Sequence, residues 1–274
     1  MSDTKTITNT QKAIVTGASG GIGQAIAREL DKAGYTLYLH GRNKLALECL
    51  KDSLEGQHHL LVGDLNDNNI QKRLLATAFE LGPIDLLVNN AGVSGFGELA
   101  DCGSDMLANQ VQTNLIAPML FTQKFVQHSL ALRQHDCKIV NVGSAFGAIG
   151  FAGFSGYCAS KFGLRGFTEA LSRELADTAI KVCYFAPRAT QTSLNSDAVT
   201  QLNISLGNAV DSVDEVAEQF MVFLNSNKTR KTLGWPEKLF VRLNGCLPEV
   251  VDMALRKKLS TIRTFTHKVT QESL

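Results

Sequence analysis

The sequence lacks the features that mark membrane-spanning, secreted and nucleic-acid-coating proteins. No segment approaches the roughly 20 consecutive apolar residues that a membrane-spanning helix needs. The first residues contain no apolar run followed by a small-residue cleavage site, so we expect no signal peptide. The formal net charge of the 274-residue chain is only +1, which predicts no nucleic-acid partner.

Cysteine and histidine are present but follow no metal-binding or disulfide pattern. The six cysteines form no C-x-x-C pair and no regular framework, which favours free thiols in a reducing compartment. The histidines and cysteines also lack the spacing of a closed zinc site, so we expect no metal. We therefore expect a cytoplasmic protein without a metal centre.

Short β-branched and leucine-rich runs alternate with longer helical stretches. This pattern is typical of βαβ units around a parallel sheet that is buried on both faces. The expected strands cover residues 12–17, 36–41, 59–65, 84–92, 138–144 and 181–187. Between the first two, Ile22, Ile26 and Leu30 recur at helical spacing and Gly34 provides a stop, which completes one βαβ unit.

No repeat, low-complexity segment or linker interrupts this alternation. We therefore expect one catalytic domain over residues 1–235, with a loose N-terminus over about 1–10. The composition changes after residue 235, where two short helices, each opened by a proline, are expected in a C-terminal extension over 236–274.

A glycine-rich turn, TGASGGIG, follows the first strand. Glycines at 17, 21 and 23 would let the backbone approach a pyrophosphate, and the start of the next helix would supply free N–H donors. Ser19 can add a hydroxyl donor. The alternative is a turn that needs glycine only for tight strand-to-helix packing.

The end of the second strand bears on the choice of dinucleotide. In dinucleotide-binding βαβ units an acidic residue about 20 positions after the glycines accepts hydrogen bonds from the ribose. Here Gly41 stands at that place and Arg42 follows it. Since a guanidinium pairs with a 2′-phosphate that a carboxylate would repel, we expect NADP(H) as the cofactor. The alternative is that Arg42 is a solvated loop cation.

Tyr157 and Lys161 lie four residues apart, so on a helix they share one face. They are either exposed surface residues or a proton-transfer pair. A cation within about 4–6 Å favours the phenolate and lowers the pKa of a tyrosine from about 10. The spacing thus suits a tyrosine that exchanges protons with a substrate oxygen.

Taken together, the glycine turn, the NNAG segment after the fourth strand and the Tyr-x-x-x-Lys pair resemble those of the short-chain dehydrogenase/reductase family. The resemblance covers residues 12–192 and continues more loosely to 235. It implies a Rossmann-type doubly wound parallel sheet and an NADP(H)-dependent oxidoreductase that interconverts a carbonyl and an alcohol.

The resemblance also implies roles for individual residues. The catalytic residues it implies are Asn114, Ser144, Tyr157 and Lys161. Tyr157 would be the general acid/base, Ser144 would bond the substrate oxygen, and Asn114 would anchor a water that relays protons from Lys161. The implied cofactor-binding residues are Gly17, Ser19, Gly21, Ile22, Gly23, Arg42, Asp64, Leu65, Asn90, Ala91, Gly92, Tyr157, Lys161, Pro187, Thr190 and Thr192. In isolation, Ser144 fits a turn serine and Asn114 a helix side chain bonded to backbone.

One position departs from the family pattern. Arg188 stands where the family has a glycine after the proline of the sixth strand. It either attracts an anionic substrate group or packs over the cofactor. Residues 193–215 correspond to the family's mobile substrate lid. Phenylalanines at 146, 151 and 154 favour a partly apolar substrate, although they equally suit a core or an oligomer contact.

The extension carries an apolar stripe, Val251, Leu255, Leu259 and Ile262, opposite basic residues. This amphipathic pattern is compatible with a membrane surface, but packing on the body or on a neighbouring subunit is favoured. A homo-oligomer, dimer or tetramer, is expected by family analogy. Two alternative functions remain open, namely an NADP(H)-binding regulator without turnover and a non-redox epimerase or dehydratase on the same scaffold.

Overall fold

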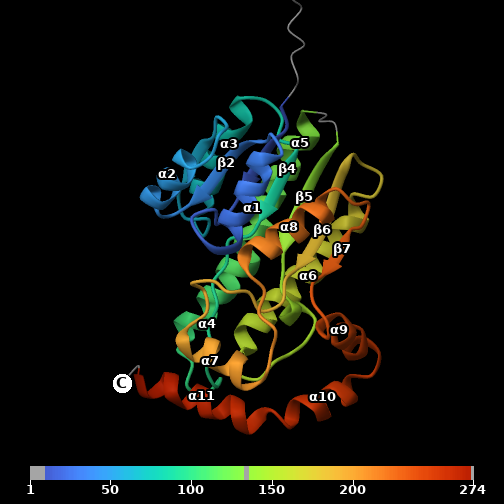
Figure 1. Ribbon diagram of the computed structural model, residues 1–274. Helices are drawn as coiled ribbons and strands as arrows, with labels where there is room; N and C mark the ends of the chain where they lie inside the picture. The colour runs from blue at the N-terminus through green and yellow to red at the C-terminus, as the bar shows by residue number, and fades with distance from the viewer. Residues whose placement is uncertain (1–9, 133–135, 273–274) are drawn as a thin grey trace, which may run out of the picture.

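The computed structural model describes residues 10–132 and 136–272, which form a parallel sheet with helices on both faces (Figure 1). The expected loose N-terminal segment lies, apart from residue 10, outside the described residues. The strand order is β3-β2-β1-β4-β5-β6-β7, and each named pair of strands is parallel. The predicted fold class, a doubly wound α/β sheet, is confirmed.

The strands in the described part of the chain are β1 (Lys12–Val15), β2 (Thr36–Gly41), β3 (His59–Val62), β4 (Leu86–Asn89), β5 (Cys137–Val142), β6 (Ile180–Ala186) and β7 (Arg230–Thr232). Six coincide with the expected segments, with ends shifted by a few residues. The edge strand β7 was missed, because its three residues are polar or basic and only their pairing with β6 makes them a strand.

The helical segments alternate with the strands as the βαβ pattern requires. They are α1 (Gly21–Lys32), α2 (Lys44–Asp52), α3 (Asn68–Glu80), α4 (Ser104–Val111), the π-helical turn η1 (Gln112–Ile116), α5 (Ala117–Ala131), the 3-10 turn η2 (Ala145–Gly147), α6 (Ser155–Glu174), α7 (Asp197–Ser205), α8 (Val213–Leu224), α9 (Glu237–Cys246), α10 (Pro248–Arg256) and α11 (Leu259–Glu272). No helix of the described segments has the length and apolar character needed to cross a membrane.

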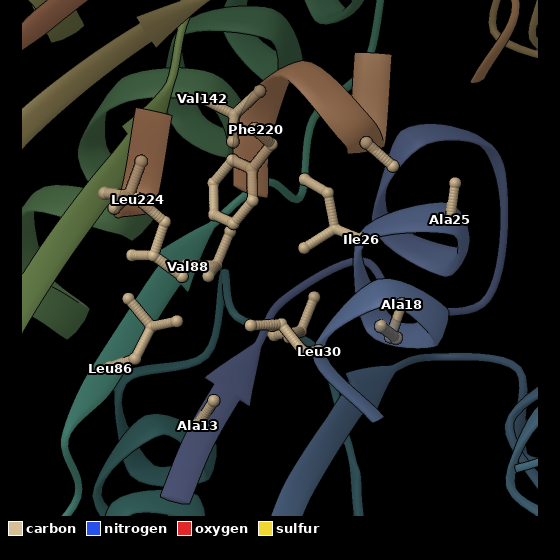
Figure 2. Packing of buried hydrophobic residues seen from close by; sticks show 14 of the residues in the cluster. Ala13, Ala18, Ala25, Ile26, Leu30, Leu86, Val88, Val142, Phe220 and Leu224 are labelled. Carbon is tan, nitrogen blue, oxygen red and sulfur yellow. The ribbon is translucent and has the colours of Figure 1, made fainter. Parts of the chain in front are cut away.

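The two faces of the sheet are buried in separate apolar clusters. On β1, Ala13 and Val15 join the cluster beneath α1 and α8, whereas Ile14 joins the cluster beneath α3 and α5. Figure 2 shows the first cluster, in which Ile26 and Phe220 meet above the sheet. Each fully buried side chain of this kind contributes about 1.5–3 kcal/mol relative to an exposed one. The alternation follows from the period of two along a strand.

The strand order reverses between β1 and β4, which are neighbours in the sheet although two strands separate them in the chain. At such a switch point the loops leaving the carboxyl ends of the two strands diverge and leave a crevice. The glycine turn follows β1, and the segment beginning at Asn90 follows β4. The fold therefore brings these two motifs to one edge of the sheet.

The C-terminal extension differs from the expectation of two helices, because a break at residues 257–258 separates α10 from α11. The break lets both helices follow the body. Val251 of α10 and Ile262 of α11 are each almost completely buried, the latter in a cluster with Phe96 and Phe154. Figure 1 shows α10 and α11 running along the end of the molecule beyond α7 and α9.

Candidate active site

The turn between β1 and α1 presents backbone donors at the edge of the sheet. Gly17 and Gly21 have positive φ angles of 66° and 54°, which side chains other than glycine rarely adopt. The helix begins after Gly20, which offers no side-chain cap, and its first turn contains no acidic residue. The uncapped amides and the positive end of the helix dipole therefore suit an anion.

Asn90 ties this turn to the end of β4. Its Nδ2 donates to the carbonyl oxygens of Thr16, at 3.0 Å, and of Gly17, at 3.3 Å. The Thr16 hydroxyl accepts from the backbone amides of Asn90 and Ala91. Gly23 packs against this contact, since a Cβ there would collide with the Gly17 carbonyl oxygen and the Asn90 side chain. Gly23 therefore acts through packing rather than by lining the cleft.

A cleft of about 390 Å³ opens beside this turn at the carboxyl ends of the strands. It contains most of the residues for which cofactor binding was predicted. Those lining it are Gly17, Ser19, Gly21, Ile22, Arg42, Asp64, Leu65, Asn90, Ala91, Gly92, Tyr157, Lys161 and Thr192. Pro187 and Thr190 line a neighbouring cavity instead, so for these two positions cofactor binding stays a prediction.

Three of the predicted catalytic side chains converge at one end of the cleft. Ser144 follows β5, and Tyr157 and Lys161 lie one turn apart on α6. The Lys161 Nζ atom is 5.8 Å from the centre of the Tyr157 ring and donates to the Val142 carbonyl at 3.1 Å. The Ser144 hydroxyl lies within hydrogen-bonding reach of the Tyr157 phenol. The phenol, the hydroxyl and the ammonium thus lie close together.

The pKa of Tyr157 differs from the expectation that Lys161 lowers it. Burial raises the pKa of Tyr157 to about 12, and the hydrogen bond with Ser144 only partly opposes this shift. Burial also lowers the pKa of Lys161 to about 8. Both shifts have one cause, because an enclosed site disfavours the charged form of each group. The phenol therefore retains its proton at neutral pH.

Asn114 lies in η1 and is completely buried. Its Oδ1 accepts from the Val93 amide, and its Nδ2 donates to the Val93 carbonyl and to the Ser160 hydroxyl, at 2.8, 2.8 and 3.0 Å. The amide thus fixes the segment after β4 against α6, one residue from Lys161. This agrees with the alternative of a side chain bonded to backbone, and a π-helical turn often marks a functional position.

Tyr184 is a site residue that sequence reasoning missed. It lies on β6, and its hydroxyl is 3.4 Å from both the backbone N and the carbonyl O of Ser144. A Cβ at Gly143 or Gly147 would collide with the Tyr184 side chain, so both glycines make room for it. Tyr184 therefore supports the loop that carries Ser144. The two glycines beside Ser144 were the only signal in the sequence, and they do not identify the side chain that they accommodate.

A second cavity, of about 240 Å³, meets the cleft at Tyr157 and extends away from the sheet. The aromatic side chains that favoured an apolar substrate line it, and they also pack on one another. The Phe146 and Phe151 rings stack with centres 4.9 Å apart, and Phe154 contacts both. The expected lid segment contributes Leu194, Asn195, Val199, Leu202, Asn203 and Asn208 to the lining.

Arg188 also lines this cavity, but its guanidinium is engaged by protein groups. Its Nη2 and Nε donate to one oxygen of Asp211, at 2.6 and 2.9 Å, and its Nη1 donates to the Trp235 carbonyl. The Glu237 carboxylate lies 3.6 Å away. Two carboxylates thus already pair with the Arg188 guanidinium, which does not favour the prediction that it attracts an anionic substrate.

No group of three or more potential metal ligands occurs within residues 10–132 and 136–272. His135, two positions before Cys137 in the sequence, lies outside the described residues.

Known proteins are similar to this chain in sequence and in fold. The family model described as short chain dehydrogenase matches residues 11–203. A 3-oxoacyl-(acyl-carrier-protein) reductase from Bos taurus is 34% identical over 216 residues, which is 77% of this chain and 90% of the relative. The structure of a short-chain dehydrogenase from Streptomyces avermitilis superposes with a TM-score of 0.77 at 25% identity, covering 93% and 98% of the two chains. An actinorhodin polyketide ketoreductase superposes with a TM-score of 0.70 at 27% identity, covering 81% and 95%. The chain therefore belongs to the short-chain dehydrogenase/reductase family of oxidoreductases.

Proposed function

We propose that the protein is an NADP(H)-dependent oxidoreductase that interconverts an alcohol and a carbonyl, such as a ketone, an aldehyde or a 3-oxoacyl group. The observation that carries this proposal is the position of Tyr157, at the junction of the cleft and the second cavity. A carbonyl carbon in the cavity would there face a hydride donor in the cleft. The names of the bovine 3-oxoacyl reductase and of the ketoreductase support carbonyl reduction.

The cleft suits a nicotinamide dinucleotide phosphate. The uncapped start of α1 would hold the pyrophosphate, and Lys161 would hold the ribose next to the nicotinamide. At the other end, a Cβ at Gly41 would come within 3.0 Å of the Ser19 Oγ, so that an acidic side chain has little room there. Arg42 lines the cleft and makes no ion pair among the described residues, which leaves it available for a 2′-phosphate. Such a cofactor supplies or accepts the hydride.

Arg42 provides the test of cofactor choice. Arg42→Ala should weaken NADPH binding far more than NADH binding, as measured by fluorescence titration. Lys44→Ala is the matched control, because Lys44 pairs with Glu48 and does not line the cleft. Equal losses for the two cofactors in Arg42→Ala would contradict the proposed 2′-phosphate contact.

Each side chain around Tyr157 has its own role in the proposed proton transfer. As hydride reaches the carbon, the Tyr157 phenol donates its proton to the developing oxyanion, and the Ser144 hydroxyl orients that oxygen. Lys161 is held by the Val142 carbonyl close enough to stabilise the phenolate that is left. We propose that Asn114, held by Val93 and Ser160, anchors a water that returns a proton through Lys161.

The raised pKa of Tyr157 favours reduction near neutral pH, since the reduction of a carbonyl needs the protonated phenol. Oxidation of an alcohol needs the phenolate, which burial disfavours. We therefore expect oxidation to become faster, relative to reduction, as the pH rises towards the pKa of about 12.

The decisive experiment measures NADPH oxidation with a panel of ketones, aldehydes and 3-oxoacyl thioesters. Tyr157→Phe removes only the phenolic oxygen and should lower kcat by about 100-fold or more, the range for loss of a general acid. Tyr35→Phe is the matched control, because it removes the same atom from a tyrosine that lines neither cavity. Equal turnover by wild type and Tyr157→Phe would show that Tyr157 is not the general acid.

The two rival functions give different results in the same assay. A regulator would bind NADPH and consume none of it with any carbonyl, and Tyr157→Phe would leave its cofactor binding unchanged. An epimerase or dehydratase would convert its substrate without net NADPH consumption. The site keeps Ser144, Tyr157 and Lys161 together, which favours turnover over both alternatives.

We also propose that the protein forms a homo-oligomer, a dimer or a tetramer. Large apolar side chains are exposed on the adjoining segments η1, α5 and α6, among them Ile116, Leu120 and Phe162. Burying them against a second copy would remove apolar surface from water. Size-exclusion chromatography with light scattering measures the number of subunits.

A further inference from the structure

One wall of the second cavity is built by the C-terminal extension, beyond residue 203, where the family match ends. The extension contributes Pro236, Glu237, Phe240, Val251, Ala254, Leu255 and Lys258 to the lining. In Figure 1 the helices that carry most of them, α9 and α10, close the end of the molecule opposite the sheet. This chain therefore completes its cavity with residues that the family pattern does not specify.

The wall is fixed in place rather than loosely apposed. Asn244 of α9 donates to the carbonyl of Ala148, in the loop after Ser144, at 2.9 Å. Beyond α10, Ile262 is buried against Phe96 and Phe154, and Arg263 pairs with Glu98 at 3.3 Å. Contacts on both sides of α10 thus hold its cavity-facing side chains at defined positions.

Those side chains follow one stripe of the helix. Val251, Ala254 and Leu255 stand at positions i, i+3 and i+4 of α10, which lie on the same face, and Lys258 follows in the break between α10 and α11, where it also lines the cavity. The first three are apolar, and the last is a partly buried lysine. The stripe therefore ends in a cation at the edge of an apolar wall.

Lys258 has no carboxylate partner among the described residues that line the cavity. The charged side chains of its lining are Arg188, Glu237 and Lys258. Arg188 is paired with Glu237 and with Asp211 behind it. No carboxylate of the described residues forms an ion pair with Lys258. Within the part of the chain that the structure describes, Lys258 is thus the charged residue of this lining without an ion-pair partner, whereas Arg188 and Glu237 pair with each other.

We propose that the cavity binds carbonyl compounds that carry a carboxylate at the end remote from the carbonyl, and that Lys258 pairs with this carboxylate. The inference rests on the proposed function, which places the carbonyl at Tyr157. The aromatic side chains would cover the middle of such a keto acid, because an apolar body gains from leaving water there. The ammonium of Lys258 would then select the acid over a neutral analogue.

The test compares benzoylbutyrate, an aryl keto acid, with its methyl ester, in which a neutral methoxycarbonyl group replaces the carboxylate. Lys258→Met keeps the aliphatic stem and removes the ammonium. It should raise the KM for the acid about five-fold, the upper range for one partly exposed charge pair, and leave kcat and the KM for the ester within about two-fold. Lys258→Arg should keep the preference for the acid, because it keeps the charge.

Lys257→Met is the matched control, since Lys257 adjoins Lys258 but is exposed and lies outside the cavity. It should leave both KM values unchanged. If Lys258→Met and Lys257→Met have the same ratio of acid to ester KM, the carboxylate contact does not exist. That result would leave the proposed reduction itself intact, provided that the wild type consumes NADPH with the ester.

A binding measurement separates the inference from the proposed function. Should no carbonyl be reduced, the proposed function fails, and calorimetry with benzoylbutyrate still decides the ligand class. Tighter binding of the acid than of the ester by wild type, lost in Lys258→Met, supports the carboxylate site. Equal affinity of the two ligands for wild type overturns it.

Discussion

Arg188 joins the body of the protein to the start of the C-terminal extension, and Arg188→Met should release that joint. On the body, the guanidinium donates to Asp211, which precedes α8. On the extension, it donates to the Trp235 carbonyl and pairs with Glu237 at the start of α9. Its side chain is 18% exposed, and those of Asp211 and Glu237 are 16% and 22% exposed. The substitution keeps much of the aliphatic stem but leaves two partly buried carboxylates without their cation.

The magnitude follows from burial and geometry. Removing one partner of a fully buried ion pair costs about 3–5 kcal/mol, whereas an exposed pair contributes less than about 1 kcal/mol. The network lies nearer the buried limit, and two of its hydrogen bonds converge on one Asp211 oxygen. We therefore expect Arg188→Met to lower the free energy of unfolding by about 2–4 kcal/mol. The pKa of Arg188 agrees, because the hydrogen bond with Asp211 raises it above its ordinary value.

Trp235 provides the assay, because it is the only tryptophan of the chain and its carbonyl accepts from Arg188. Urea unfolding is followed by the polarisation of Trp235 fluorescence and, in parallel, by far-ultraviolet circular dichroism. In Arg188→Met the polarisation should fall at lower urea than the dichroism, because the extension detaches before the sheet unfolds. The wild type should show the two transitions much closer together.

The control is Arg165→Met, which removes an arginine that pairs with Glu169 on the surface of α6 and is 36% exposed. Its cost should stay below about 1 kcal/mol. If Arg188→Met costs no more than Arg165→Met, or if its two transitions coincide as in the wild type, the guanidinium does not hold the extension.

Two further predictions test the glycine turn and the buried lysine. Gly23→Ala should destabilise the fold by about 1–3 kcal/mol and weaken NADPH binding, because its Cβ would collide with the Gly17 carbonyl. In Gly20→Ala the added Cβ meets nothing within 4 Å, so the free energy of unfolding measured in urea should hardly change. Equal behaviour of the two variants would contradict the packing argument. Burial lowers the pKa of Lys161 from 10.5 to about 8. Between these two pH values the unfolded chain therefore binds more protons than the folded chain. The free energy of unfolding of wild type relative to Lys161→Met should therefore rise from pH 8 to 10.5, by at most about 1.4 kcal/mol per pH unit, and a flat or falling difference would refute the burial of the charge.

Sequence reasoning succeeded where the signal is local. The expected β-strands consist of short apolar runs, and the positions of Tyr157 and Lys161 on one helix face follow from a spacing of four residues. The glycine turn likewise lies within eight consecutive residues. Each of these features is decided by neighbours in the chain, so the pattern alone indicated the sheet, the turn and the paired side chains.

The features that were missed depend on residues far apart in the chain. Arg188 meets Asp211, 23 positions on, and Tyr184 supports Ser144 from 40 positions away. The strand β7 exists only because β6 offers it an edge. The pKa of Tyr157 belongs to the same group, since the proximity of Lys161 was evident from the sequence, but the burial that outweighs it depends on the whole fold.

Arg188 holds the start of the segment that forms the cavity wall, and Lys258 lies at the end of that segment. Substitutions at the two positions therefore test the shape of the wall and its charge separately. Glu237, which Arg188 holds, begins α9, and Lys258 follows the end of α10. Arg188→Met should loosen the wall, so that Val251 and Lys258 shift together and the KM for a keto acid and for its ester rise alike. Lys258→Met leaves the wall in place and should affect the acid alone. If the wall mattered only through its charge, the ester would be insensitive to both substitutions.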